Sequence, residues 1–106
     1  MDGGWEALHV DDAGTGAPVL LVHGQPGLGT DWELVVEDLL GDHRVLTPDR
    51  PGYGRSQQAP VSMRENADLL ADMLAARAAA PAVVVGHSYG GGIAILMAAH
   101  RPEVVR

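Results

Sequence analysis

The chain has 106 residues, of which 46% are hydrophobic and 20% are charged, and this composition fits one soluble globular domain or a part of one. The net charge is −7 and the seven basic residues are all arginines that stand singly, so no basic stripe for nucleic acid is present; the absence of cysteine excludes disulfides and thiolate zinc sites. No stretch approaches the roughly 18 apolar residues of a membrane span, and residues 1–10 lack the pattern of a signal peptide, which together indicate a cytoplasmic protein without membrane contact.

The first half of the chain alternates strand-like and helix-like segments. Residues 5–10 alternate apolar and polar side chains, which predicts a half-buried strand, and a turn-forming cluster follows at 11–16. Residues 18–24 form a short apolar run that predicts a strand buried on both faces. After a glycine-rich loop, Thr30 and Glu33 have the spacing of a capping box and predict a helix that stops at Gly41. We expect this helix to bury one face, made of Trp32, Val35, Val36, Leu39 and Leu40.

The second half continues the alternation. Residues 43–49 predict a strand, and the proline and glycines that follow it predict an irregular loop at 49–56. A second capping box at Ser62 and Glu65 predicts a helix that ends before Pro81. The remaining elements are a third buried strand at 82–86 and a helix at about 89–100.

This order of elements predicts an α/β fold with a mainly parallel sheet flanked by helices. In such sheets the functional groups lie on the loops that follow the carboxyl ends of the strands. Three loops qualify, namely 23–29, 49–56 and 86–91.

Residues 86–90 read Gly-His-Ser-Tyr-Gly and match the pattern G-x-S-x-G between a predicted strand and a predicted helix. A strand that reverses into a helix within a few residues strains the backbone at its apex and leaves Ser88 exposed. The residues two before and two after Ser88 then come too close for a Cβ, which accounts for Gly86 and Gly90. The N–H groups after Ser88 begin a helix and point to where an oxyanion would form. The segment therefore predicts a nucleophilic serine.

The alternative for this segment is a glycine-rich turn that cradles a phosphate. The pattern G-x-x-x-x-G-K-[ST] is absent, and none of the four G-x-G pairs has the third glycine of a dinucleotide-binding loop. Nucleotide binding is therefore disfavoured, and we predict neither a cofactor nor a metal.

The other two loops carry weaker signals. Residues 23–27, His-Gly-Gln-Pro-Gly, end a buried strand, and the backbone N–H of Gln25 can point toward the same pocket as Ser88; alternatively, the segment is a turn with an incidental histidine. Residues 49–56, Asp-Arg-Pro-Gly-Tyr-Gly-Arg-Ser, indicate only a tight turn by their chemistry.

In this order and spacing, the three segments resemble the N-terminal half of the α/β-hydrolase superfamily, over nearly the whole chain. The resemblance is to its esterase-like branch with a serine nucleophile, and not to the dehalogenases and epoxide hydrolases that use aspartate. It implies that Ser88 is the nucleophile, that the amides of Gln25 and Tyr89 form the oxyanion hole, and that a small-molecule ester, amide or lactone is hydrolysed without a cofactor. The motif residues to which the resemblance gives a structural role are His23, Gly24, Gly86, His87 and Gly90.

The base that would activate Ser88 is not evident. The family order is serine, then an acid, then histidine, but after Ser88 the chain offers only His100 and Glu103, in the wrong order and too close together. Asp49 and His23 are interpreted as structural, and His9, His43 and His87 are not placed to serve. We therefore expect residues 1–106 to be the N-terminal portion of a single α/β-hydrolase domain, truncated before the later core strands. Such a fragment lacks the acid and histidine loops and any cap, and we expect it to be inactive or nearly so alone.

Residues 82–86 would then form an exposed apolar sheet edge, which predicts self-association. Two other interpretations remain open. One is a non-catalytic ligand-binding or receptor protein on the same fold, and the other is a half-domain whose sheet is completed by another chain.

Overall fold

A single four-stranded sheet organises the chain, with strand order β1-β3-β2-β4 in the computed structural model, which describes residues 4–106. Strands β2 (Ala17–Val22), β3 (His43–Asp49) and β4 (Val83–Gly86) run parallel, and β1 (His9–Ala13) pairs antiparallel with β3 at one edge. The predicted α/β fold with a mainly parallel sheet is confirmed. Residues 1–3, part of the segment without a signal-peptide pattern, lie outside the described residues.

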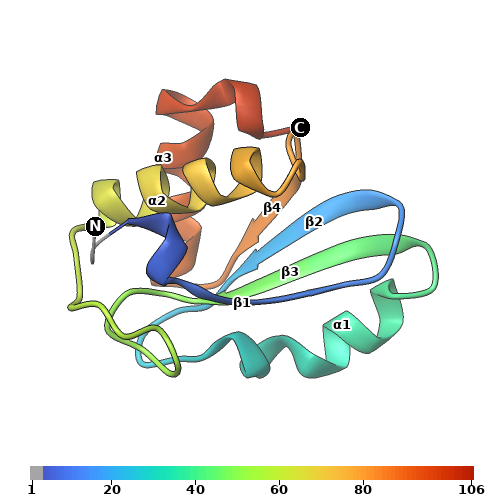
Figure 1. Ribbon diagram of the computed structural model, residues 1–106, viewed down its shortest axis with the longest axis horizontal. Helices are drawn as coiled ribbons and strands as arrows, with labels where there is room; N and C mark the ends of the chain where they lie inside the picture. The colour runs from blue at the N-terminus through green and yellow to red at the C-terminus, as the bar shows by residue number, and fades with distance from the viewer. Residues whose placement is uncertain (1–3) are drawn as a thin grey trace.

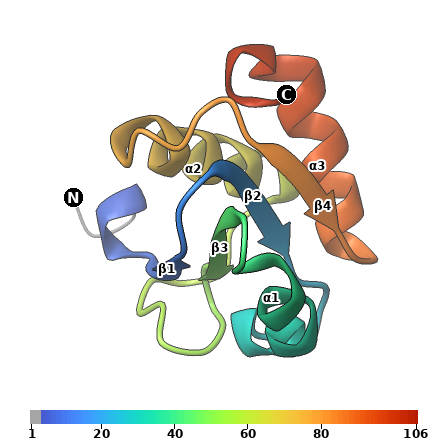
Figure 2. The same cartoon turned by 90° about the vertical axis from the view of Figure 1, so that its right-hand side faces the viewer.

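Helices cover both faces of the sheet. Helix α1 (Glu33–Leu39) lies on one face, and α2 (Met63–Ala76) and α3 (Tyr89–His100) lie together on the other (Figures 1 and 2). None of the helices in this described part of the chain is long and apolar enough to cross a membrane.

The apolar run in β2 is buried because both of its faces are covered. Leu20 and Val22 point to the larger core with α2 and α3, whereas Val19 and Leu21 point to a smaller cluster under α1. The larger core also includes Leu46, Leu70, Leu74, Ile93 and Met97, all fully buried.

The capping box that opens α2 forms as the sequence predicts. The hydroxyl of Ser62 accepts the N–H of Glu65 at 3.1 Å, and the carboxylate of Glu65 accepts the N–H of Ser62 at 3.4 Å. The helix ends at Ala76, before Pro81, as expected.

The prediction for residues 5–16 is wrong in its boundaries. Residues Trp5–Ala7 form a 3₁₀ helix, and β1 continues through Ala13, where a turn was expected. The strand tolerates Asp12 because its carboxylate accepts two hydrogen bonds from Arg44 on β3, at 2.7 and 2.9 Å, and it tolerates Asp11 because this residue is exposed. The turn itself is confined to the residues between β1 and β2.

The capping box predicted at Thr30 is also wrong. The carboxylate of Asp31 accepts the N–H of Leu28 at 3.0 Å, so the cap lies at Leu28, two residues earlier than predicted, and a 3₁₀ helix, Gly29–Trp32, leads into α1. Trp32, Val36 and Leu39 pack against the smaller cluster, but Val35 and Leu40 are exposed rather than buried.

Strand β4 lies at the edge of the sheet, and Val83 and Val85 are 43% and 39% exposed. The prediction of a third buried strand is therefore wrong within this chain, whereas the exposed apolar edge expected at residues 82–86 is observed. At its start, Ala82 forms a parallel bridge with Val105. Beyond that bridge, no other segment of residues 4–106 pairs with the outer edge of β4.

Candidate functional site

The three loops singled out in the sequence meet at one edge of the sheet. Val22, the last residue of β2, pairs with Gly86, the last residue of β4, so the loops that follow them start side by side. Strand β3 is the neighbour of β2 on its other side and ends at Asp49, which brings the third loop to the same edge.

Ser88 occupies a sharp turn between β4 and α3. Its backbone has φ 56° and ψ −118°, an unfavourable conformation for a residue with a side chain, and it stands immediately before the first residue of α3. The residue as a whole is exposed. A strained, exposed serine at the N-terminus of a helix fits the turn that the sequence pattern predicted.

Two glycines make this turn sterically feasible. A Cβ on Gly86 would overlap the carbonyl oxygen of Gly90, and a Cβ on Gly90 would overlap the carbonyl oxygen of Val22 and lie 2.8 Å from that of His23. All of these neighbours are backbone atoms, which cannot move aside without shifting β2 or α3.

The loop after β2 lies directly against the turn at Ser88. A Cβ on Gly24 would lie 3.0 Å from the carbonyl oxygen of His87 and 3.3 Å from the Cβ of Ser88. Within residues 4–106, the backbone N–H groups of Gln25 and Tyr89 have no hydrogen-bond acceptor. The geometry therefore places two free backbone donors on the two segments that meet at Ser88.

His23 is fully engaged in holding its own loop. One ring nitrogen, Nδ1, lies 2.7 Å from the carbonyl oxygen of Gly24, and the other, Nε2, accepts the backbone N–H of Arg50 at 3.0 Å. Burial lowers the pKa of His23, and the charge of Arg50 lowers it further. The ring is thus neutral, with Nδ1–H as the donor, and this geometry fits the structural role expected from the sequence.

Arg50 is a functional-site residue that the sequence interpretation missed. Its side chain is 1% exposed. Its Nε donates to the carbonyl of His23 at 3.0 Å, and its Nη2 donates to the carbonyl of Gly24 at 3.1 Å. Two weaker contacts join Nη2 to Gln25 Oε1 at 3.4 Å and Nη1 to Asn66 Oδ1 at 3.3 Å.

The guanidinium of Arg50 also makes cation–π contacts with two tyrosines. Its central carbon lies 4.9 Å from the ring centre of Tyr53 and 4.8 Å from that of Tyr89. The only hint in the sequence was the presence of tyrosines in two of the three loops, together with an arginine that directly follows a buried strand.

Asp49 ties the third loop to the segment before α1. Its carboxylate accepts the N–H of Gly29 at 2.7 Å and the N–H of Arg55 at 3.0 Å. Both carboxylate oxygens are therefore used within the protein, which fits the structural interpretation of this residue.

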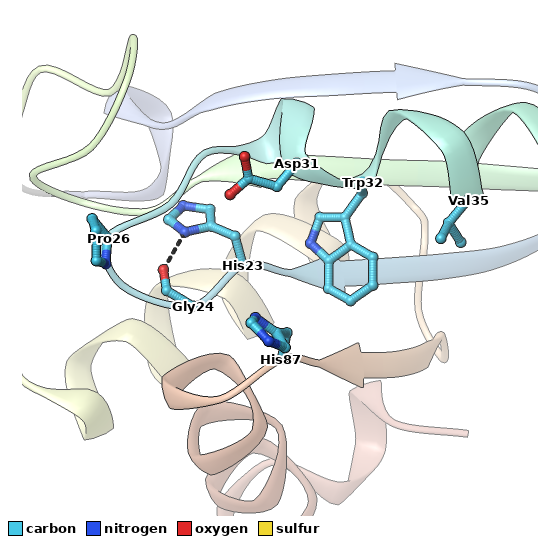
Figure 3. Close-up of a pocket in the computed structure, with 7 residues that line it drawn as sticks. All are labelled: His23, Gly24, Pro26, Asp31, Trp32, Val35 and His87. Carbon is cyan, nitrogen blue, oxygen red and sulfur yellow. Dashed lines mark hydrogen bonds between the residues drawn. The ribbon is translucent and has the colours of Figure 1, made fainter.

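A pocket of about 430 Å³ opens beside these loops on the α1 side of the sheet (Figure 3). Its walls are His23, Gly24, Pro26, Asp31, Trp32, Val35 and His87. His87 lines this pocket, and the Cβ of Ser88 lies beside Gly24, another of its walls. Among the described residues, the indole N–H of Trp32 is buried without a hydrogen-bond partner.

No histidine of residues 4–106 forms a hydrogen bond with Ser88. His9 contacts Asp11 and Arg55, and His43 contacts Asp42. Over the same residues, no group of three or more histidine, aspartate or glutamate side chains is placed to hold a metal ion.

Comparison with known proteins identifies close relatives. The pattern of the alpha/beta hydrolase family matches residues 19–106. The 2-hydroxymuconate semialdehyde hydrolase of Pseudomonas sp. (strain CF600) is 37% identical over 92% of this chain and 37% of its own length. A thermophilic esterase from Thermogutta terrifontis superimposes with a TM-score of 0.87 and 38% identity, over 92% of this chain and 37% of the esterase.

An epoxide hydrolase from an endophytic Streptomyces also superimposes, with a TM-score of 0.84 and 34% identity over 92% of this chain and 31% of its own. The chain therefore spans about a third of the length of these relatives, from 31% to 37%.

Proposed function

Because the chain belongs to the alpha/beta hydrolase family and folds as the N-terminal part of that domain, we propose that it supplies the nucleophile of a serine hydrolase. The substrate would be a small molecule with an ester, amide or lactone carbonyl. The single observation that carries the proposal is the strained, exposed backbone of Ser88 at the start of α3, beside two free backbone N–H groups.

The reaction would run through an acyl-enzyme. A histidine base removes the proton from Ser88 Oγ as this oxygen attacks the carbonyl carbon. The carbonyl oxygen becomes an oxyanion that accepts hydrogen bonds from the N–H groups of Gln25 and Tyr89. Collapse of this intermediate breaks the bond to the leaving group, which takes up the proton, and water then hydrolyses the acyl ester on Ser88.

The position of Tyr89 strengthens its donor role. As the first residue of α3, it carries one of the N–H groups that have no partner inside the helix, and the helix dipole is positive at this end. Removal of one donor of an oxyanion hole typically costs on the order of 10²–10³ in turnover.

A serine favours acyl transfer over epoxide opening. If Ser88 attacked an epoxide carbon, the product would be an alkyl ether, which water does not hydrolyse under mild conditions. Attack on a carbonyl gives an ester, which water can hydrolyse in the second step. This argument separates the proposed activity from that named for the similar epoxide hydrolase. The mechanism requires no cofactor.

The 106 residues alone are proposed to lack turnover. No described histidine contacts Ser88, and loss of the base in a serine protease costs on the order of a millionfold in turnover. The base, its acid partner and the residues that select the substrate would then have to come from outside the described residues. A binding protein without catalysis remains the alternative, and it predicts no acylation of Ser88.

A fluorophosphonate probe tests the proposal. With the protein at its native length, we expect stoichiometric labelling that maps to Ser88 by mass spectrometry and is lost in Ser88→Ala. The isolated 106-residue chain should be labelled slowly or not at all. Absence of labelling at the native length would contradict the nucleophile, and stoichiometric labelling of the 106-residue chain would contradict its inactivity.

A further inference from the structure

We propose that Arg50 positions the oxyanion hole by fixing the orientation of the Gly24–Gln25 peptide and the location of Tyr89. The inference rests on the proposed function, because it concerns the two N–H groups to which that proposal gives the oxyanion. It makes Arg50 a positioning residue, since its own contacts are with the loops and not with Ser88.

The first step of the argument is the direction of one peptide group. In a trans peptide, the C=O and the N–H point in opposite directions. The carbonyl of Gly24 accepts two hydrogen bonds, one from Arg50 Nη2 at 3.1 Å and one from His23 Nδ1 at 2.7 Å. The N–H of the same peptide group belongs to Gln25, so it points away from Arg50 and stays free.

The second step is the anchoring of the rest of the loop. The carbonyl of His23 accepts Arg50 Nε, and His23 Nε2 accepts the backbone N–H of Arg50. The side chain of Gln25 accepts both Arg50 Nη2 at 3.4 Å and the hydroxyl of Tyr53 at 3.2 Å. Each of three successive loop residues is therefore tied to Arg50, and the peptide cannot flip without breaking several bonds together.

The third step connects Arg50 to the other donor. Its guanidinium stacks on the ring of Tyr89 at 4.8 Å, and the backbone N–H of Tyr89 is the second free donor. The ring of Tyr53 also lies near the guanidinium, with its centre 4.9 Å from the central carbon of Arg50. One side chain thus spans the gap between the segments that follow β2 and β4.

In the described part of the chain, the buried charge of Arg50 is compensated by neutral groups and not by a carboxylate. A buried cation is costly unless it is paired, yet none of the ion pairs formed by residues 4–106 includes Arg50. Its partners are carbonyl and amide oxygens and two rings. Asn66 illustrates this design: its Nδ2 donates to the carbonyls of Val61 and Ser62, which turns Oδ1 toward Arg50.

An arginine placed only for stability would make the same contacts, so the test must separate the two roles. We suggest Arg50→Met and Arg50→Lys in the protein at its native length, with hydrolysis of a short p-nitrophenyl ester as the assay. Arg44→Met is the matched control, because Arg44 forms a partly buried ion pair with Asp12 on the β1–β3 pair, away from Ser88. All measurements are made well below the melting temperature of each variant.

The expected result is a fall in kcat with little change in KM. Arg50→Met should lose about 10²–10³-fold in kcat, comparable to the loss of an oxyanion donor. Arg50→Lys should fall between Arg50→Met and the wild type, because a lysine keeps the charge but not the planar fork. Arg44→Met should lower the melting temperature and leave kcat unchanged. A trifluoromethyl ketone, which forms an oxyanion on the serine, should bind the Arg50 variants more weakly by the same factor as kcat.

Three results would overturn the inference. They are a kcat within twofold of wild type for both Arg50 variants, a loss that appears in KM alone, or unchanged affinity for the trifluoromethyl ketone. If Arg50→Met does not fold, the kcat of Arg50→Lys and the affinity of that variant for the trifluoromethyl ketone test the inference. Failure of the proposed function is a separate outcome, because the wild type would then not react with the fluorophosphonate probe at all.

Discussion

The Cα of Gly86 faces the carbonyl of Gly90 so closely that no side-chain atom fits between them. The two residues flank Ser88 at equal distances along the chain, and their contact closes the turn that holds Ser88 at φ 56°. The adjacent Gly91 provides a comparison, because a Cβ there would be in ordinary van der Waals contact with Gly86, whereas a Cβ on Gly90 would overlap backbone atoms.

Alanine at Gly86 or Gly90 should therefore destabilise the protein, whereas Gly91→Ala should not. The first two changes force overlap with backbone atoms, and we expect a loss of roughly 1–3 kcal/mol or more in the free energy of unfolding. A Cβ on Gly91 would meet its nearest atom at 3.6 Å, so this change should be neutral or gain up to about 1 kcal/mol from helix propensity. Urea unfolding measures all three. Equal effects at Gly86 and Gly91 would contradict this account of the turn.

His23 should titrate below its ordinary pKa of about 6.5. Burial disfavours its charged form, so the folded protein holds the ring neutral while the unfolded chain protonates near the ordinary value. Below about pH 6.5 the unfolded state then binds more protons than the folded state. The free energy of unfolding should therefore decrease as the pH falls from about 6.5 to the pKa of His23 in the folded protein. NMR titration of the His23 ring should show a midpoint below 6.5. A midpoint at or above that value would refute the prediction.

The same proton would break the link to the neighbouring loop, because protonated Nε2 cannot accept the N–H of Arg50. His23→Asn provides a comparison, since its amide can still donate toward Gly24 but does not titrate. The pH dependence of the free energy of unfolding below about pH 6.5 should be shallower in this variant than in wild type.

The exposed face of β4 should promote self-association of the 106-residue chain. Val83 and Val85 are both near 40% exposed on an edge strand, and flat apolar edges of this kind pair with other chains. Val85→Lys should shift light-scattering masses toward the monomer. Glu37→Lys is the control, because it adds a lysine at an exposed position of α1 away from β4. A wild-type chain that is monomeric at high concentration would disprove this.

The two S/T-x-x-E sequences in this chain should respond differently to alanine. Ser62→Ala removes a formed cap of α2 and should cost about 1 kcal/mol. Thr30→Ala should cost less than about 0.5 kcal/mol, because Thr30 is exposed and lies inside a 3₁₀ helix rather than at its cap. Similar costs for both changes, measured by chemical denaturation, would argue against the structural distinction.

These two sequences also show which structural features the amino-acid sequence can predict. Both match the capping pattern, but only the structure reveals that Asp31 binds the N–H of Leu28 and starts the first helix early. The turn at Ser88 could be predicted because the pattern that forms it lies within five consecutive residues, although the contact of Gly90 with the carbonyls of Val22 and His23 is visible only in the fold. The exposure of β4 could be predicted only together with an expectation of which strand is placed beside it, because the apolar run alone indicates a buried strand. Arg50 escaped notice because its role depends on His23, Gly24 and Tyr89, which come from two other loops.

The pairing of Val22 with Gly86 sets the spacing between the loop that follows β2 and the turn at Ser88. Neighbouring strands are held about 4.8 Å apart by their hydrogen bonds, and each residue advances the chain by about 3.3 Å. If β4 slipped by one residue against β2, Ser88 would move by that distance relative to Gln25 and its neighbours would change faces of the sheet. The alignment of donor and nucleophile is thus inherited from the backbone ladder of two parallel strands.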